Sequence, residues 1–242
     1  MAKEFRQGEE ASVLPQIQQT TLPTIADQVF DELQKRILTL ELPPGTKLAE
    51  LDVAKTMGVS RQPVREAFKR LSKLGFLVIR PQSSTTVSLI SEESILRARF
   101  IRTALEVQTS RAACVTLDEK GHAELADILE EQKAAIVAND RNLFHALDES
   151  FHRQICALSG VGYVWDLIHD NKAHMDRVRM LSLNSSSQQH ALDEHVAILD
   201  AIIKGDQDTA AQATVDHLSR ILILIEEIKG VNHRWFTDSS SR

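Results

Sequence analysis

One acidic and three histidine side chains in the second half of the chain could together bind a metal ion. Asp148 and His152 are four residues apart, so they project from the same face of one predicted helix. His195 lies on the next-to-last predicted helix and His217 on the last. One carboxylate and three imidazoles form a borderline-soft ligand set that suits Zn²⁺, with Ni²⁺ or Mn²⁺ as alternatives. Spacing alone leaves another interpretation open, in which Asp-x-x-x-His occurs by chance and both later histidines are ordinary polar positions.

A second group of side chains, nearer the N-terminus, has the chemistry of a DNA reader. Ser60, Arg61, Gln62 and Arg65 crowd the first turns of one predicted helix. Arginine can bond guanine O6 and N7 together, glutamine can do the same for adenine, and a helix N-terminus offers backbone N–H groups to a phosphate. Any one of these residues could instead be a solvated side chain or a cap. The interpretation therefore depends on the turn and hairpin that surround them.

The charge distribution favours DNA as the partner of this first region. The whole chain has a net charge of −6, but residues 1–80 carry a net +2 and residues 81–242 a net −8. Between Ser60 and Arg80 six basic residues stand against one acid, Glu66. A local basic stripe on an acidic protein is the electrostatic signature of a DNA-reading element, although charge alone would fit a solvated helix face equally well.

The elements around the basic helix predict a winged helix-turn-helix domain over residues 22–90, preceded by a disordered arm over residues 1–21. Apolar residues at helical spacing follow Pro23-Thr24, and Gly58 supplies a left-handed turn residue between the second and third helices. On the third helix, one apolar face should pack on the first two helices. One expected helix begins at residue 24, and two others span 50–57 and 60–74. A short strand is expected over 47–49, and two longer strands over 76–80 and 85–89, with a wing tip at 82–85. The apolar face of the third helix consists of Val64, Ala67, Phe68 and Leu71.

Residues 91–230 predict an all-α, antiparallel six-helix bundle, so the fold class of the whole chain is mainly α. An antiparallel bundle could bring the Asp and the three His into one cavity. The polar segment 231–242 is expected to be a flexible tail. The six expected helices are 92–115, 119–138, 140–158, 161–182, 187–203 and 206–229.

Composition indicates a cytoplasmic globular protein. The 242 residues are 43% apolar and 26% charged, and no apolar run reaches the length needed to span a bilayer. The first residues lack the apolar region of a secretory signal. Cys114 and Cys156 lie within apolar helical patterns, as reduced core cysteines do. We therefore expect no membrane partner.

Three stretches of the first domain resemble the N-terminal domain of GntR-family transcription regulators: Leu42-Pro-Pro-Gly-Thr-Lys-Leu, Gly58-Val-Ser-Arg-Gln-Pro-Val-Arg-Glu-Ala and Leu71-Ser-Lys-Leu-Gly-Phe-Leu. The resemblance implies that Arg61, Gln62 and Arg65 read bases and that Ser60 and Arg80 lie near phosphates. Leu51 stands where many relatives have an arginine, and the wing lacks the glycines common in the family.

The second half resembles the FCD domain of the FadR subfamily, and its six expected helices suggest the shorter, VanR-like group. The matching marks are Arg102-Thr-Ala-Leu-Glu106, Asp148-x-x-x-His152, His195-x-x-Ile-Leu-x-Ala-Ile, Gly205-Asp206 and Asp216-His-Leu. The resemblance implies that Asp148, His152, His195 and His217 hold a metal ion, most simply zinc.

The resemblance also implies a small carboxylate effector, such as a hydroxy acid, sugar acid or dicarboxylate. Arg102, Arg177 and Arg179 are candidates for neutralising its charge. Alternatively, Arg102 pairs with Glu106 one turn on, and the other two arginines are surface residues. His174 is a further candidate for the cavity.

Together these features predict a metabolite-responsive transcription regulator, a repressor on family grounds. A homodimer would place two basic helices in successive major grooves of a palindromic operator. The outer faces of the first and fourth helices of the bundle are candidates for the dimer contact. Two alternatives stay open: a metalloenzyme with an appended DNA-binding head, and a DNA-binding protein whose metal is purely structural.

Overall fold

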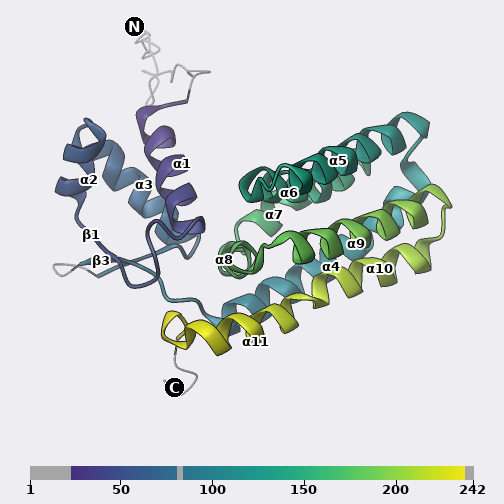
Figure 1. Cartoon of the computed structure of the whole chain (residues 1–242). Helices are drawn as coiled ribbons and strands as arrows, with labels where there is room; N and C mark the ends of the chain where they lie inside the picture. Colours follow the sequence, from purple (N-terminus) through teal and green to yellow (C-terminus); the bar gives the residue numbers. More distant parts are fainter. Residues whose placement is uncertain (1–22, 81–83, 238–242) are drawn as a thin grey trace, which may run out of the picture.

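The computed structural model describes residues 23–80 and 84–237. The predicted disordered arm and all but the end of the predicted wing tip lie outside the described residues. Figure 1 shows a small N-terminal domain of helices and a short sheet beside a larger, wholly helical domain. The mainly helical fold class is confirmed.

The N-terminal domain is a helix-turn-helix with an antiparallel sheet of order β1-β3-β2. Thr24 caps the first helix, and a capping box with Asp27 fixes its start. The predicted inner face of the third helix is buried, as expected. The elements are α1 Ile25–Leu38, β1 Lys47–Leu48, α2 Glu50–Met57, α3 Arg61–Lys73, β2 Leu77–Ile79 and β3 Thr85–Val87.

The turn before the basic helix depends on one glycine. Gly58 has φ +68°, a left-handed conformation that strains other residues, and it lets the Val59 N–H reach the Ala54 carbonyl at 3.0 Å. Ser60 occupies the N-cap position of α3 in extended conformation, but its hydroxyl makes no capping hydrogen bond. This leaves the Ser60 side chain available to a partner.

The C-terminal domain is an all-α bundle in which two of the six predicted helices are each divided. Within the described residues it contains α4 Glu92–Thr116, α5 Glu119–Val137, α6 Arg141–Leu158, α7 Tyr163–His169, α8 Ala173–Ser182, α9 Ser185–Ile203, α10 Gln207–Ser219 and α11 Ile221–Asn232, followed by a 3₁₀ turn, η1 His233–Trp235. No helix among them is long and apolar enough to cross a membrane.

The two breaks have local causes that apolar periodicity does not reveal. The expected helix 161–182 stops where the Asn171 amide donates to the Leu167 carbonyl at 2.8 Å and Lys172 turns inward to Asp176 at 2.6 Å. The expected helix 206–229 is interrupted at Arg220, whose carbonyl accepts from the N–H of Ile223 at 3.0 Å. At this point a hydrogen bond between residues three apart, as in a 3₁₀-helix, is added to the α-helical bonds between residues four apart.

The flexible tail is predicted to begin at residue 231, but regular structure continues beyond that residue. The chain from 231 continues α11 and then η1, and Phe236 is buried against the linker between the domains. Ile90 donates its N–H to Trp235 at 2.7 Å and accepts from the N–H of Thr237 at 2.9 Å. Burial of one aromatic ring and this parallel bridge order the chain as far as Thr237. Residues 238–242 lie outside the described residues.

Candidate functional site

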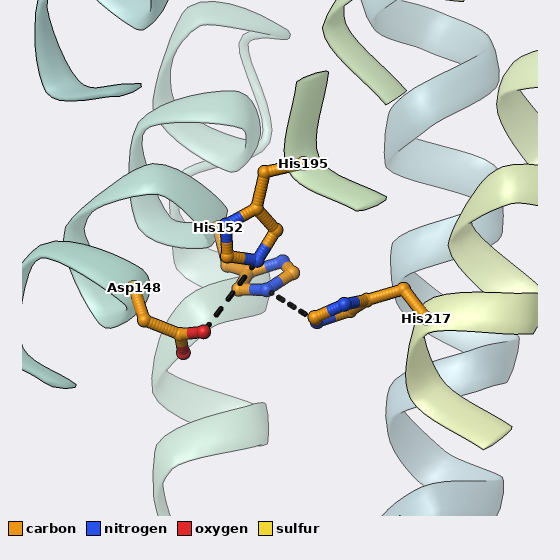
Figure 2. A group of neighbouring side chains, drawn as sticks. All are labelled: Asp148, His152, His195 and His217. Carbon is orange, nitrogen blue, oxygen red and sulfur yellow. Dashed lines mark hydrogen bonds and ion pairs between the residues drawn. The ribbon is translucent and has the colours of Figure 1, made fainter. Parts of the chain in front are cut away.

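The four predicted metal ligands converge in the core of the helical domain. Asp148 and His152 come from α6, His195 from α9 and His217 from α10, and all four side chains are buried. One candidate ligand atom from each lies within 4.8 Å of the others. Figure 2 shows the carboxylate and the three rings directed at a common point. The structure thus brings together all four residues, although they come from three helices.

Each imidazole is held by a side chain bonded to its outer nitrogen. His152 Nδ1 lies 2.8 Å from Glu106 Oε2, and His217 Nδ1 lies 2.9 Å from Glu194 Oε2. His195 Nδ1 lies 2.9 Å from Gln132 Oε1. Such outer contacts fix the orientation and tautomer of metal-binding histidines.

Gln132 is oriented by the main chain. Its Nε2 donates to the Leu147 carbonyl at 3.2 Å, which leaves Oε1 to accept from His195. Because the glutamine and glutamate oxygens act as acceptors, each ring carries its hydrogen on Nδ1. A neutral ring with its hydrogen on Nδ1 directs the lone pair of Nε2 at the centre.

This arrangement fits a cation. His152 Nε2 and His217 Nε2 are 3.2 Å apart, and when both rings are neutral with their hydrogens on Nδ1 the two lone pairs repel at that distance. Burial foremost keeps the pKa of His217 well below its ordinary value, so a proton on that ring does not relieve the repulsion. Zn–N bonds of about 2.0–2.1 Å place two nitrogen ligands of one ion roughly 3.0–3.4 Å apart. The observed spacing lies in that range.

Asp148 remains charged although it is buried. Burial opposes ionisation, but Arg179 and then His195 outweigh it and hold the pKa of Asp148 well below its usual range. Arg179 Nη2 contacts Asp148 Oδ1, which is also 3.5 Å from His195 Nε2. Asp148 Oδ2 and His195 Nε2 are buried without a hydrogen-bond partner. Such unsatisfied atoms need a physical explanation, and a cation at the centre would satisfy both.

A small cavity of about 40 Å³ reaches the centre. Asp148, Arg179 and His217 line its polar side. Beyond it a wider, open cavity of about 490 Å³ shares Ser182, Ser187, Arg220 and Leu224 with the inner one. The wider cavity is of the size in which proteins hold small ligands, and we refer to it as the vestibule.

The three predicted effector-binding arginines have different surroundings. Arg179 alone lies at the cavity. Arg102 is buried and donates from Nε to Glu106 Oε1 at 2.5 Å. Of the two interpretations of Arg102, effector binding or pairing with Glu106, the structure therefore shows the pairing. The guanidinium braces Glu106, whose pKa burial would raise but Arg102 and His152 hold well below normal. Arg177 is buried at the domain junction, away from the cavity, where Nη1 donates to Ser88 Oγ at 3.0 Å.

The predicted DNA-reading side chains are all exposed. Ser60, Arg61, Gln62 and Arg65 are exposed on α3, and Arg80 is exposed at the end of β2. Glu50, at the start of α2, contacts Arg65 Nη2 at 3.0 Å and Arg61 Nη2 at 3.3 Å. Hydrogen bonds from Arg65 foremost lower the pKa of Glu50, so it stays ionised and orients both guanidinium groups.

The sequence interpretation missed Gln132, Glu194, Arg220 and Glu50. Gln132 had a signal: it continues the spacing of Leu125 and Leu129 on the buried face of α5, where a polar residue needs a partner. Glu194 directly precedes His195, so it faces elsewhere and meets His217 on the neighbouring helix. No spacing along the chain predicts such a contact between helices.

Two known families match this chain, one over each of its structural domains. Residues 25–87 match the bacterial regulatory proteins of the gntR family, and residues 98–220 match the FCD domain. Among solved structures, McbR/YncC of E. coli is similar, with a TM-score of 0.73 and 22% identity over 85% of this chain and 99% of that one. A transcriptional regulator from Rhodococcus sp. RHA1 aligns with a TM-score of 0.68 and 21% identity, over 81% and 97%. These likenesses show the fold.

Curated relatives of higher identity are regulators by name. The repressor RspR of Escherichia coli K12 is 34% identical over 215 residues, 88% of this chain and 94% of that protein. A probable repressor of the D-xylose utilisation operon of Paenarthrobacter nicotinovorans is 30% identical, over 84% and 89%. The chain therefore belongs to the GntR family of bacterial transcription regulators, carries an FCD domain as its C-terminal half, and is not an enzyme.

Proposed function

We propose that this regulator is a repressor whose affinity for its operator is changed by a small carboxylate bound at a metal-containing cavity. The observation that supports it is the convergence of three imidazole nitrogens and one ionised carboxylate beside a cavity lined by Arg179. Binding at the cavity must favour one arrangement of the DNA-reading helices over another to have any effect. By linkage, operator DNA then changes the affinity for the acid by the same factor.

The metal ion would be held by Asp148, His152, His195 and His217. Zinc suits three imidazoles and one carboxylate best, and Ni²⁺ or Mn²⁺ would also bind such a set. The bound ion supplies positive charge and open coordination positions for an anionic oxygen. The outer partners Glu106, Gln132 and Glu194 keep the rings in place.

The carboxylate of the effector would lie between the metal centre and Arg179. A guanidinium can bond a carboxylate with two parallel hydrogen bonds. The inner cavity has room for little more than this group, so the rest of the molecule would occupy the vestibule. Arg220 lines both cavities and pairs with Glu194 at 3.1 Å, which places it where the two meet.

The regulator would act as a homodimer on a palindromic operator. Two symmetric recognition helices match two half-sites about one helical turn apart. Large apolar side chains are exposed on α4, at Leu96 and Phe100, and on α7, at Tyr163 and Leu167. Phe100 is 75% exposed and Tyr163 68% exposed, and such apolar faces mark contacts with another protein surface. Two relatives named as repressors support the direction of regulation.

Fluorescence anisotropy on the DNA upstream of the protein's own gene tests the proposal. The protein would be titrated at fixed salt, metal-free or zinc-loaded, with and without a panel of hydroxy, sugar and dicarboxylic acids. We expect one acid to weaken the specific complex of the zinc-loaded protein. His217→Ala should lose this response, while His122→Ala, on α5 and outside the lining of both cavities, should keep it. Tight binding that no acid changes would favour a purely structural metal instead.

A further inference from the structure

Helix α8 contacts both the cavity and the DNA-reading domain. Arg179 lines the cavity and contacts Asp148, and Met175 and Ser182 also line it. Arg177 lies two residues earlier, about 200° around the helix, and donates to Ser88 at the end of the N-terminal domain. One short helix therefore presents one arginine to each domain.

The start of α8 is packed into the N-terminal domain. Ala173 belongs to the same apolar cluster as Phe68 and Leu71 of α3. His174 Nδ1 accepts the N–H of Ser91 at 3.3 Å. Gly75, with φ +83°, makes room for the ring, since a side chain there would place Cβ 3.2 Å from His174 Nε2. His174, a further candidate for the cavity from the sequence, therefore lies at the domain junction instead.

Arg177 is an unusual residue for such a junction. Its side chain is 0% exposed, yet among residues 23–80 and 84–237 Nε and Nη2 have no hydrogen-bond partner, and Ser88 Oγ is the one acceptor for Nη1. No acidic side chain in the described part of the chain forms an ion pair with it. Burial lowers its pKa to about 10 and leaves it charged at neutral pH. A buried charge without a counter-charge destabilises the arrangement that buries it.

We propose that α8 transmits the state of the cavity to the DNA-reading domain, and that the unpaired Arg177 weakens the contact between the domains so that it can open and close. The transmission rests on the proposed function, whereas the weakened contact does not. A junction with low opening free energy is what a switching regulator requires, because a ligand can shift only states that are separated by a few kcal/mol.

Hydrogen exchange of the metal-free full chain, followed by mass spectrometry, tests both parts. The reporter is the linker Ser88–Ser91, in which the N–H groups of Ile90 and Ser91 are bonded to Trp235 and His174 of the helical domain. Arg177→Met retains an unbranched side chain but removes the charge, and should slow exchange in the linker about tenfold. Ser88→Ala removes the one acceptor of the guanidinium and should speed exchange.

The opposite signs of these two effects are the critical result. If Arg177 were an ordinary anchor, both variants would speed exchange, and that outcome, or unchanged exchange in Arg177→Met, would overturn the weakened contact. Arg97→Met, an exposed position on α4, serves as the surface control and should leave the linker unaffected.

Asp148→Asn tests the transmission in the same experiment. It replaces the charged partner of Arg179 in the cavity and should change exchange in Ser88–Ser91, with α5 as an internal reference for overall stability. Unchanged linker exchange in that variant would overturn the transmission. Because no metal, acid or DNA is present, this result is independent of whether an acid releases the operator.

Discussion

The Nε2 atoms of His152 and His217 face each other at 3.2 Å, while the outer nitrogens of both rings are bonded to glutamates. Neither ring can rotate to relieve the repulsion without losing its bond to Glu106 or Glu194. The helices therefore hold a pair of nitrogen donors at a spacing that becomes favourable when a cation binds. Folding maintains this arrangement, and a bound ion should stabilise the fold in return.

Zinc should raise the melting temperature of protein that has been stripped with EDTA. An ion that binds only the folded state stabilises it by about 4 kcal/mol at a thousandfold excess over the dissociation constant. His217→Ala should lose most of this rise, and His122→Ala, outside both cavities, should retain it. Differential scanning fluorimetry measures the effect, and an equal rise in His217→Ala would contradict the assignment.

Arg102→Ala should destabilise the metal-free protein by about 3–5 kcal/mol, because it leaves Glu106 as a buried charge without its counter-charge. The double variant Arg102→Met with Glu106→Gln should recover most of this loss, since an amide needs no counter-charge and its oxygen still accepts from His152 Nδ1. Urea denaturation measures the free energy of unfolding. If the single variant were as stable as the double one, Arg102 would not brace the site.

The four residues that converge in the core could be identified from the sequence because the family resemblance placed each one on a matching residue. Their outer partners could not. Glu106 and Gln132 occupy inward positions of α4 and α5, which indicates a buried role but names no partner. Glu194 meets His217 only because α9 and α10 pack side by side.

The fold was predictable to the extent that its signals are local. The caps at Thr24 and Asn184 and the left-handed Gly58 are visible as residue types. The break between α7 and α8 is not, because the apolar pattern continues through it while Lys172 turns inward to Glu149 and Asp176. The place of Arg177 likewise depends on how the two domains pack.

Arg65→Ala should cost roughly 1–3 kcal/mol of specific operator affinity if this side chain reads a base. Affinity for unrelated DNA should fall less, so the ratio of specific to non-specific affinity should decrease. Arg97→Ala, on the helical domain, is the matched control. Anisotropy at several salt concentrations separates base reading from phosphate contact, and a loss that is uniform across sequences would assign Arg65 to the backbone.

Glu50→Gln should also lower the ratio of specific to non-specific DNA affinity, for a different reason. The variant removes the charge that holds Arg61 and Arg65 in place, so the arginines stay cationic but lose their common orientation. We expect affinity for unrelated DNA to rise and discrimination to fall. Unchanged discrimination would show that Glu50 does not position the two arginines.

Phe100→Asp should dissociate the proposed homodimer. A carboxylate in place of this exposed ring on α4 would have to be desolvated on association, which costs several kcal/mol. Sedimentation at micromolar concentration should show monomers, with the fold unchanged by circular dichroism. Val137→Asp, an exposed apolar residue on α5, is the control and should remain dimeric. A dimeric Phe100→Asp would move the contact to another face.

Acidification should weaken the domain junction through His174. Burial, and then Arg177, lower the pKa of His174 to about 4 from an unfolded value of 6.5. The unfolded chain binds the proton first, so the stabilisation is complete above pH 6.5 and is lost as the pH falls towards 4. Between pH 7 and pH 5 this residue should cost about 1–2 kcal/mol.

His174→Asn isolates this contribution from that of the other buried histidines. Burial also lowers the pKa of His145, His195 and His217, so the wild type loses stability on acidification for several reasons. Asparagine can still accept the Ser91 N–H but does not titrate. Urea denaturation at pH 7 and pH 5 should therefore show a smaller pH dependence in His174→Asn, and an equal dependence in both proteins would mean that His174 is protonated as readily in the folded state as in the unfolded one.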